Sequence, residues 1–444
     1  MGRDTWGGHP RGLVILAATE LAERFSYYGM TALLALYMTK QLLLPGHAEN
    51  AIGLAGLRAL MEWRGPISNL AFASLIYGWY GGLVYFTPVL GGLIADRWLG
   101  AKRTVTLGAL LMAGGHLAMS FDATFLLALL LLIAGSGLLK GNISAQVGAL
   151  YAPEAESKRA RGFTIFSTGI NIGSVLGPLG SGTLAVLYGW HAGFALAAGV
   201  MLAALAVYLF GQAYLPERQS HTETARPPSL TKEERTRLWA LAGLVAINVL
   251  PQIAYMMIWS IGILWVDQRV NLATSLGSVP ASWFNSADSF ASIIVVPPLL
   301  ALWSMQARRG SEPGGIAKIA MGGLLTGLSA LLLAAGDLIA GPEGRVSVWW
   351  AIAGYFGMGL AFMWYWPITL ALVSQTAPAK ANATMVSASF LALFFASTIM
   401  GWVGSFYEEM SKPAFWTMDA AIGFTGAFVA FALRGPLSRR IGAG

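Results

Sequence analysis

Three charged side chains interrupt an apolar segment near the start of the chain. Glu20, Glu23 and Arg24 lie between GLVILAAT and MTALLALYM, and both flanks suit the hydrocarbon core of a bilayer. A charge at the centre of a membrane costs about 2.5–3.5 kcal/mol on insertion scales, and such residues usually mark a transport or proton pathway. Glu20 and Arg24 are four positions apart, so they can meet on one face of a helix. We predict an intramembrane ion pair that takes part in proton movement; a pair that only fixes helix packing is the alternative.

Two further charges are expected inside membrane helices. Lys140, in GSGLLKGNISAQVG, is the expected partner of the carboxylate that Arg24 leaves unpaired, so that two acids and two bases balance. Protonation of Glu20 or Glu23 would then free Lys140 and act as a switch. Asp288 adds a third acid, which can serve as a second proton site. The alternatives are a lysine that extends to the membrane interface and an aspartate that is paired within the fold.

The composition indicates that membrane helices position these charges. Of the 444 residues, 56% are hydrophobic and 11% are charged, against about 25% charged in an average soluble domain. The absence of Cys excludes disulfides and thiolate metal sites. No sequence cluster of His with Asp or Glu indicates a metal site, and no glycine-rich phosphate loop is evident. We therefore expect a multi-pass membrane protein without a cofactor, with the proton as coupling ion.

Runs of about 20 apolar residues can cross a bilayer as helices, and twelve such runs flank the polar segment Pro216–Arg237, six on each side. We predict an all-α membrane protein with two six-helix bundles, 1–215 and 237–444, joined by a cytoplasmic linker at 216–236. The predicted spans are 12–42, 68–97, 103–122, 124–151, 161–189, 191–215, 237–266, 280–305, 316–339, 347–375, 382–408 and 414–434.

The basic residues predict the orientation of these spans. With the N-terminus in the cytoplasm, most of the 28 Lys and Arg residues fall in cytoplasmic connections, as the positive-inside rule requires. Both termini are therefore expected to be cytoplasmic, in the cell (inner) membrane. The net charge of +7 then reflects topology in the lipid bilayer, and we expect no nucleic-acid partner.

The charged segment also resembles a known motif. Glu20–Tyr28, ELAERFSYY, is similar to the ExxERFxYY motif of proton-coupled oligopeptide transporters, a branch of the major facilitator superfamily. Phe166–Ser174, FSTGINIGS, resembles the FYxxINxGS signature of that family, and Gly91–Arg103 resembles its loop between spans two and three. The resemblance runs along most of the chain and implies the major facilitator fold and proton-driven symport of small peptides.

The resemblance implies roles for individual residues. Glu20, Glu23, Arg24 and Lys140 would form the proton-coupling cluster. The N-terminal side of the substrate site would consist of Tyr27, Tyr28, Tyr85, Lys140 and Asn171. Asp96 and Arg97 would belong to a cytoplasmic gate, for which an ordinary loop ion pair is the alternative.

The substrate site departs from the family pattern. Thr31 stands where the family usually carries an Arg that holds the substrate carboxylate, and Phe362 stands where it keeps a Glu that binds the peptide amine. Asp288 stands at a family Asn and is one candidate to take over the amine. Trp364 is predicted to line the substrate site with its aromatic neighbours; a belt of interfacial aromatic residues is the alternative.

We therefore expect a monomeric symporter that takes up small peptides or peptide-like amines together with protons by alternating access, with the substrate bound between the two bundles. A proton-coupled transporter or antiporter of a non-peptide solute or drug is the alternative. A polytopic membrane enzyme or a sensor is a more remote one.

Overall fold

The computed structural model describes residues 5–6, 8–152, 155–216, 230–274 and 277–442. Within these residues the chain is helical, apart from two short antiparallel hairpins, β1 (Thr5–Trp6) with β2 (His9–Pro10) and β3 (Ala273–Thr274) with β4 (Gly277–Ser278). The prediction of an all-α protein is confirmed.

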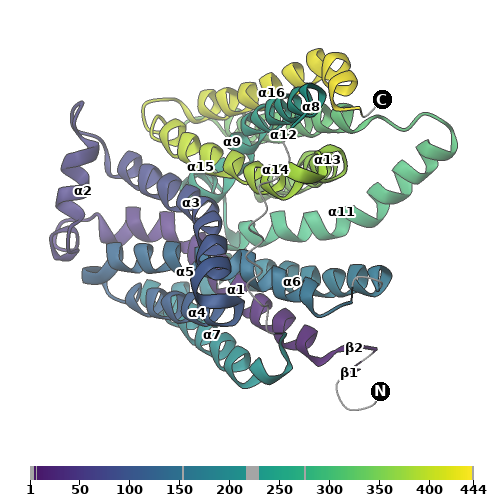
Figure 1. The fold of residues 1–444 in the computed structure, drawn as a ribbon. Helices are drawn as coiled ribbons and strands as arrows, with labels where there is room; N and C mark the ends of the chain where they lie inside the picture. Colours follow the sequence, from purple (N-terminus) through teal and green to yellow (C-terminus); the bar gives the residue numbers. More distant parts are fainter. Residues whose placement is uncertain (1–4, 7, 153–154, 217–229, 275–276, 443–444) are drawn as a thin grey trace. The chain divides into compact units, whose positions relative to one another are not determined.

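The chain forms two compact units, and each contains long helices (Figure 1). Unit 1 comprises residues 1–72 and 83–224, and unit 2 comprises residues 73–82 and 225–444. The described elements of the first half are α1 (Arg11–Tyr37), η1 (Met38–Leu42), η2 (Ala48–Asn50), α2 (Leu54–Met61), α3 (Asn69–Ile94), η3 (Ala95–Leu99), α4 (Gly100–Ala118), η4 (Asp122–Thr124), α5 (Phe125–Ala149), α6 (Glu156–Tyr188), α7 (Trp190–Gly211) and η5 (Gln212–Tyr214). The predicted domain boundaries stay a prediction, and residues 217–229 of the predicted linker lie outside the described residues.

The second half of the chain contains a similar series of helices. Its described elements are α8 (Lys232–Ile247), α9 (Val249–Met257), η6 (Ile258–Gly262), α10 (Ile263–Arg269), α11 (Trp283–Arg308), α12 (Gly315–Ala340), α13 (Val348–Thr376), η7 (Ala379–Ala381), α14 (Asn382–Ser389), α15 (Leu391–Gly404) and α16 (Lys412–Ile441). Each predicted span coincides with one or more of the helices in the two halves, whereas α2 was not predicted.

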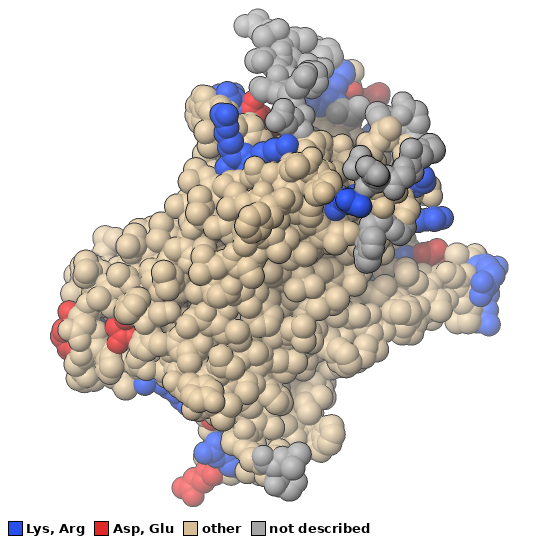
Figure 2. Space-filling model, turned by 90° about the horizontal axis from the view of Figure 1, so that it is seen from below, with Lys and Arg blue, Asp and Glu red and all other residues tan. Residues whose placement is uncertain are grey.

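Ten segments among the described residues are long and apolar enough to cross a membrane. One of them, Asn69–Ala118, contains both α3 and α4, and α1 is not among the ten. Uncharged residues cover most of the face shown in Figure 2, as expected of surface that contacts lipid. The chain is a multi-pass membrane protein.

Small residues allow α3 and α5 to pack closely in unit 1. A Cβ at Gly91 would collide with the carbonyl oxygen of Gly137 and would lie 3.0 Å from the Cα of Leu138. The amide of Asn142 donates a 3.1 Å hydrogen bond to the carbonyl of Gly91 across the same contact. Glycine in membrane helices permits this kind of close approach, and the contact fixes the relative position of the side chains on the two helices.

Gly91→Ala is expected to lower the free energy of unfolding by about 1–3 kcal/mol, because the added methyl group overpacks this contact. Gly92→Ala is the matched control, because a Cβ at Gly92 meets nothing within 4 Å. Thermal unfolding of the detergent-solubilised variants measures the difference. Equal unfolding temperatures for the two variants would contradict the close packing of α3 and α5.

Candidate functional site

The charged residues of α1 form a buried cluster in unit 1. Arg24 Nε lies 3.0 Å from Glu20 Oε1 and also forms an ion pair with Glu23 Oε2. All three side chains are buried, and Glu20 Oε2 and Glu23 Oε1 accept no hydrogen bond from the described residues. The predicted Glu20–Arg24 pair is present. One guanidinium group faces two carboxylates, so one negative charge is left over at this point.

Lys140 of α5 lies near this cluster but makes a different contact from the expected one. Its Nζ lies 4.8 Å from the centroid of the Tyr27 ring and 4.8 Å from that of the Tyr85 ring. Among the residues that the structure describes, Lys140 forms no ion pair, so its expected contact with Glu23 is absent and Arg24 takes that place. Two electron-rich ring faces stabilise the ammonium group by cation–π attraction.

Close contact between α1 and α6 positions the cluster. A Cβ at Gly173 of α6 would lie 2.8 Å from the Cβ of Arg24, and one at Gly177 would collide with the carbonyl of Phe25. Asn171, predicted to bind substrate, lies on the same helix and is exposed. Tyr28 packs edge-to-face on Tyr27, with ring centroids 5.2 Å apart. The helices α1, α3, α5 and α6 therefore bring together most of the residues predicted for the N-terminal side of the site.

The predicted gate residues occupy a separate place in unit 1. Asp96 and Arg97 are both exposed and lie in η3, a π-helical segment that follows α3. Their role as a gate stays a prediction.

Asp288 lies in unit 2, in the second turn of α11, and is almost fully buried. Its Oδ2 accepts a 2.9 Å hydrogen bond from the hydroxyl of Tyr255, and Trp259 also donates to the carboxylate. Asp288 Oδ1 has no hydrogen-bond partner among the described residues, and neither side-chain atom of the nearby buried Asn285 has one. The carboxylate therefore has one oxygen bound by uncharged donors and one oxygen without a donor.

The donors to Asp288 lie where the α-helix α9 passes into the π-helical segment η6. Tyr255 and Trp259 are four residues apart, at the end of α9 and the start of η6. The carbonyl of Ile258 in η6 accepts a 2.9 Å hydrogen bond from the buried hydroxyl of Tyr355. Single π-helical turns inside α-helices occur often at functional sites. Sequence reasoning missed both donors, although their i, i+4 spacing of polar aromatic residues was a usable signal.

The Phe362 side chain packs on the ring of Tyr255. The two rings stack with centroids 4.8 Å apart and planes inclined by 24°. A Cβ at Gly359, one turn before Phe362, would lie 3.1 Å from Asp288 Oδ1. Phe362 on α13 and the Asp288 carboxylate on α11 therefore both contact Tyr255.

Thr31 and Trp364 have local partners. The Thr31 hydroxyl is buried and donates to the carbonyl of Tyr27, 2.9 Å away, so its own helix satisfies it. Trp364 packs with Val295 and Leu299 in an apolar cluster, and its ring meets the edge of Trp303 at 5.3 Å. This packing places Trp364 inside unit 2 rather than in an exposed aromatic belt.

Comparison with known proteins identifies the family. A sequence model of the POT family matches residues 102–231 and 228–418. The chain belongs to the POT family. It is 27% identical over 511 residues to the di-/tripeptide transporter of Lactococcus lactis subsp. cremoris, and the match covers 99% of this chain and 98% of the relative. It is also 28% identical over 470 residues to the uncharacterized transporter YclF of Bacillus subtilis (strain 168), covering 92% and 90%.

Solved structures agree with this assignment. The crystal structure of the peptide transporter POT in complex with sulfate is 26% identical, has a TM-score of 0.86, and covers 99% of this chain and 97% of that one. A second crystal structure, of a mutant of the peptide transporter POT in complex with alafosfalin, is 27% identical with a TM-score of 0.85, covering 98% and 96%. These proteins are transporters, and this POT family chain is a transporter rather than an enzyme.

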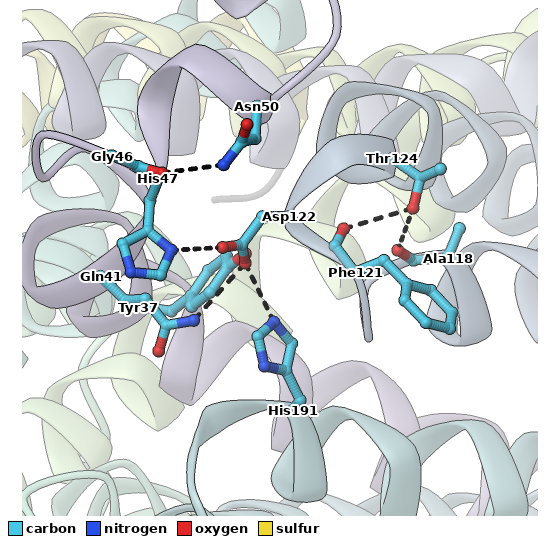
Figure 3. Close-up of polar contacts among 10 residues, drawn as sticks. All are labelled: Tyr37, Gln41, Gly46, His47, Asn50, Ala118, Phe121, Asp122, Thr124 and His191. Atoms are coloured by element: carbon cyan, nitrogen blue, oxygen red, sulfur yellow. Dashed lines mark hydrogen bonds and ion pairs between the residues drawn. The ribbon is translucent and has the colours of Figure 1, made fainter.

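A second polar cluster of this POT family member surrounds Asp122, where α4 leads into α5 (Figure 3). Its Oδ1 accepts hydrogen bonds from the Tyr37 hydroxyl at 2.5 Å and the Gln41 amide at 3.5 Å. His47 Nδ1 lies 2.7 Å from Oδ2, and His191 Nε2 lies 3.0 Å from Oδ1. Sequence reasoning missed this cluster because its members are far apart in the chain. Asp122 joins α1, η1, the segment after η1 and α7.

Asp122→Ala is expected to lower the free energy of unfolding by about 1–3 kcal/mol, because it removes the shared acceptor of several partly buried donors. Glu49→Ala is the matched control, because Glu49 is exposed and, among the described residues, accepts only from the nearby backbone N–H of Gly46 at 2.7 Å. Thermal unfolding in detergent compares the two. An Asp122 variant as stable as the control would contradict a structural role for the cluster.

Proposed function

We propose that this chain is a proton-coupled symporter that takes up small peptides or peptide-like amines by alternating access. It acts as a monomer in the cell (inner) membrane and needs no cofactor other than the proton as coupling ion. Family membership and the relatives named as peptide transporters support the substrate class.

The proposed topology has twelve spans in two six-helix bundles with both termini cytoplasmic. Two features support adding two spans to the ten apolar segments. The segment Asn69–Ala118 is interrupted by η3 and by Gly100, whose φ of +72° suits a glycine at a break between α3 and α4. The helix α1 is long enough to cross a bilayer, and inside unit 1 its Arg24 forms ion pairs with both of its buried carboxylates.

The observation that carries the proposed proton coupling is the sharing of Arg24 by Glu20 and Glu23. Two buried carboxylates with one guanidinium group leave one negative charge, and a buried unpaired charge is costly. One proton removes that charge. Protonation also weakens the attraction that the carboxylates exert on Lys140. The protonation state of the cluster therefore changes the electrostatic attraction on the Lys140 ammonium group. We propose that Lys140 contacts the substrate, together with Tyr27, Tyr28, Tyr85 and Asn171.

Asp288 is proposed to bind the substrate amine in place of the family glutamate that Phe362 replaces. The stacking of Phe362 on Tyr255 and the hydrogen bond from Tyr255 to Asp288 support this, because both positions contact the same tyrosine. Asp288 Oδ1 lacks a donor, and an ammonium group is a donor that a carboxylate binds strongly. The unpaired amide of Asn285 is proposed to contact the same ligand.

A second candidate function is proton-coupled transport or antiport of a non-peptide solute. Thr31 favours it, since its hydroxyl is bonded to its own helix and supplies no cation for a substrate carboxylate. A ligand with an amine and no carboxylate could still bind Asp288 through its amine. A thermal-shift screen of purified protein against peptides, amines and amino acids separates the two functions, because a ligand at 100 times its Kd stabilises by about 2.7 kcal/mol.

Glu20→Gln and Glu23→Gln are expected to abolish uptake driven by a proton gradient in liposomes, because an amide cannot take up and release the coupling proton. Counterflow of the same peptide without a gradient is expected to persist. Glu49→Gln is the control, since Glu49 is exposed and remote in sequence from the cluster. Full gradient-driven uptake by both variants would contradict the proposed coupling.

Asp288→Asn is expected to weaken binding of a peptide with a free amine by roughly ten- to a hundredfold, since hydrogen bonds to charged groups contribute about 1.5–3 kcal/mol. Competition by the N-acetylated form of that peptide should change little, because it lacks the cation. Tyr255→Phe provides a milder perturbation of the same carboxylate. Equal losses for both peptides would show that Asp288 does not recognise the amine.

A further inference from the structure

The helix α2 of unit 1 connects the end of the first predicted span to the beginning of the second. It lies between η1, which ends at Leu42, and α3, which begins at Asn69. The backbone N–H of Ile52 donates a 3.1 Å hydrogen bond to the carbonyl of Ala123, next to Asp122. His47 of the same segment contacts Asp122 directly. The N-terminal end of α2 is thus tied to the corner between α4 and α5.

One face of α2 is fixed to the protein by Arg58. Its guanidinium group donates to Glu62 at 2.9 Å, to Asn69 at 2.7 Å and to the carbonyl of Ile67 at 2.9 Å. It also lies over the ring of Phe72, 5.3 Å from the centroid. The hydrogen bonds from Arg58 and from the Ile67 N–H hold the pKa of Glu62 below its usual range. The charges of this face are therefore paired with each other and with the start of α3.

The opposite face of α2 is exposed and carries no charge. Gly56, Ala59 and Leu60 lie on one side of the helix by their i, i+3, i+4 spacing, and Trp63 follows in the turn after α2 ends at Met61. Leu60 is 71% exposed and Trp63 is 75% exposed, and Ile52 just before the helix is 75% exposed. Large apolar side chains gathered on one face usually mark an interaction surface.

The direction of α2 and its flanking residues indicate which environment this face meets. Figure 1 shows α2 running across the direction of α5, which is one of the apolar segments long enough to span a membrane. A helix across the direction of the spans lies along the plane of the bilayer. Arg64 stacks on Trp63, 4.6 Å from its centroid, and Trp is enriched at the level of the lipid headgroups.

We propose that α2 is an interfacial helix that inserts Leu60 and Trp63 between the lipid headgroups and acyl chains, with Arg64 at the level of the phosphates. Such helices lie in the plane of the interface with their apolar face in the membrane. A second copy of the chain is a poorer fit. The eight residues of α2 form a helix about 12 Å long, too short to supply the roughly 800 Å² per partner of a stable protein interface.

The absence of Cys from the sequence permits a direct test on the complete protein. A nitroxide is attached to the single cysteine of Leu60→Cys, and the protein is reconstituted in phospholipid nanodiscs. Glu49→Cys is the matched control, on the same connecting segment and also exposed. Power saturation measures collisions of each label with oxygen, which concentrates in the bilayer, and with a water-soluble nickel chelate.

The label at position 60 is expected to show a severalfold higher ratio of oxygen to nickel collisions than the label at position 49. Equal ratios would place α2 in water and overturn the proposal. Low accessibility of the position 60 label to both reagents would indicate a protein contact and would also overturn it. The spectrum of the label is also compared between nanodiscs that hold one copy of the protein and nanodiscs that hold several. Dipolar broadening only in the nanodiscs with several copies would show that a second copy forms that contact. This test does not depend on transport activity.

Discussion

The burial of charge in an apolar helix is the constraint on which the rest of this structure depends. A lone ion in the centre of a bilayer is costly, so Glu20, Glu23 and Arg24 must be compensated inside the protein. Arg24 contacts both carboxylates, and the Lys140 ammonium group lies over two tyrosine rings nearby. Arg24 lies on α1 itself, whereas Lys140 and Tyr85 come from α5 and α3, so these two helices have to approach α1.

Small residues make that approach possible. Gly173 and Gly177 bring α6 against the backbone of α1, and Gly91 brings α3 against Gly137 of α5. In lipid, association of helices depends on packing and hydrogen bonds between them, because apolar side chains gain little by leaving an apolar solvent. The glycines of this chain therefore contribute to function indirectly, since they set the positions of Arg24, Tyr85 and Lys140 relative to one another.

Glu20 and Glu23 of unit 1 and Asp288 of unit 2 are stabilised by different means. In unit 1 the Arg24 guanidinium faces the carboxylates, whereas in unit 2 the hydroxyl of Tyr255 and the ring N–H of Trp259 bind Asp288, which forms no ion pair with the described residues. Uncharged donors leave the carboxylate free to bind a cation or a proton from outside the protein. This difference is the physical basis for assigning coupling to unit 1 and amine recognition to unit 2 in the proposed function.

The sequence by itself determined what depends on neighbours along the chain. Hydropathy located the long helices, and the four-residue spacing predicted the Glu20–Arg24 pair. The motif around Tyr27 and Tyr28 indicated the family. These features depend on residues that are close in sequence, and their spacing within a helix is the same whatever the helix packs against. Only the tertiary structure decided the contacts between elements. The rings beneath Lys140, the donors to Asp288 and the meeting of His47 and His191 at Asp122 join residues that are distant in sequence. Their distances depend on how closely helices pack, and no local pattern contains that information.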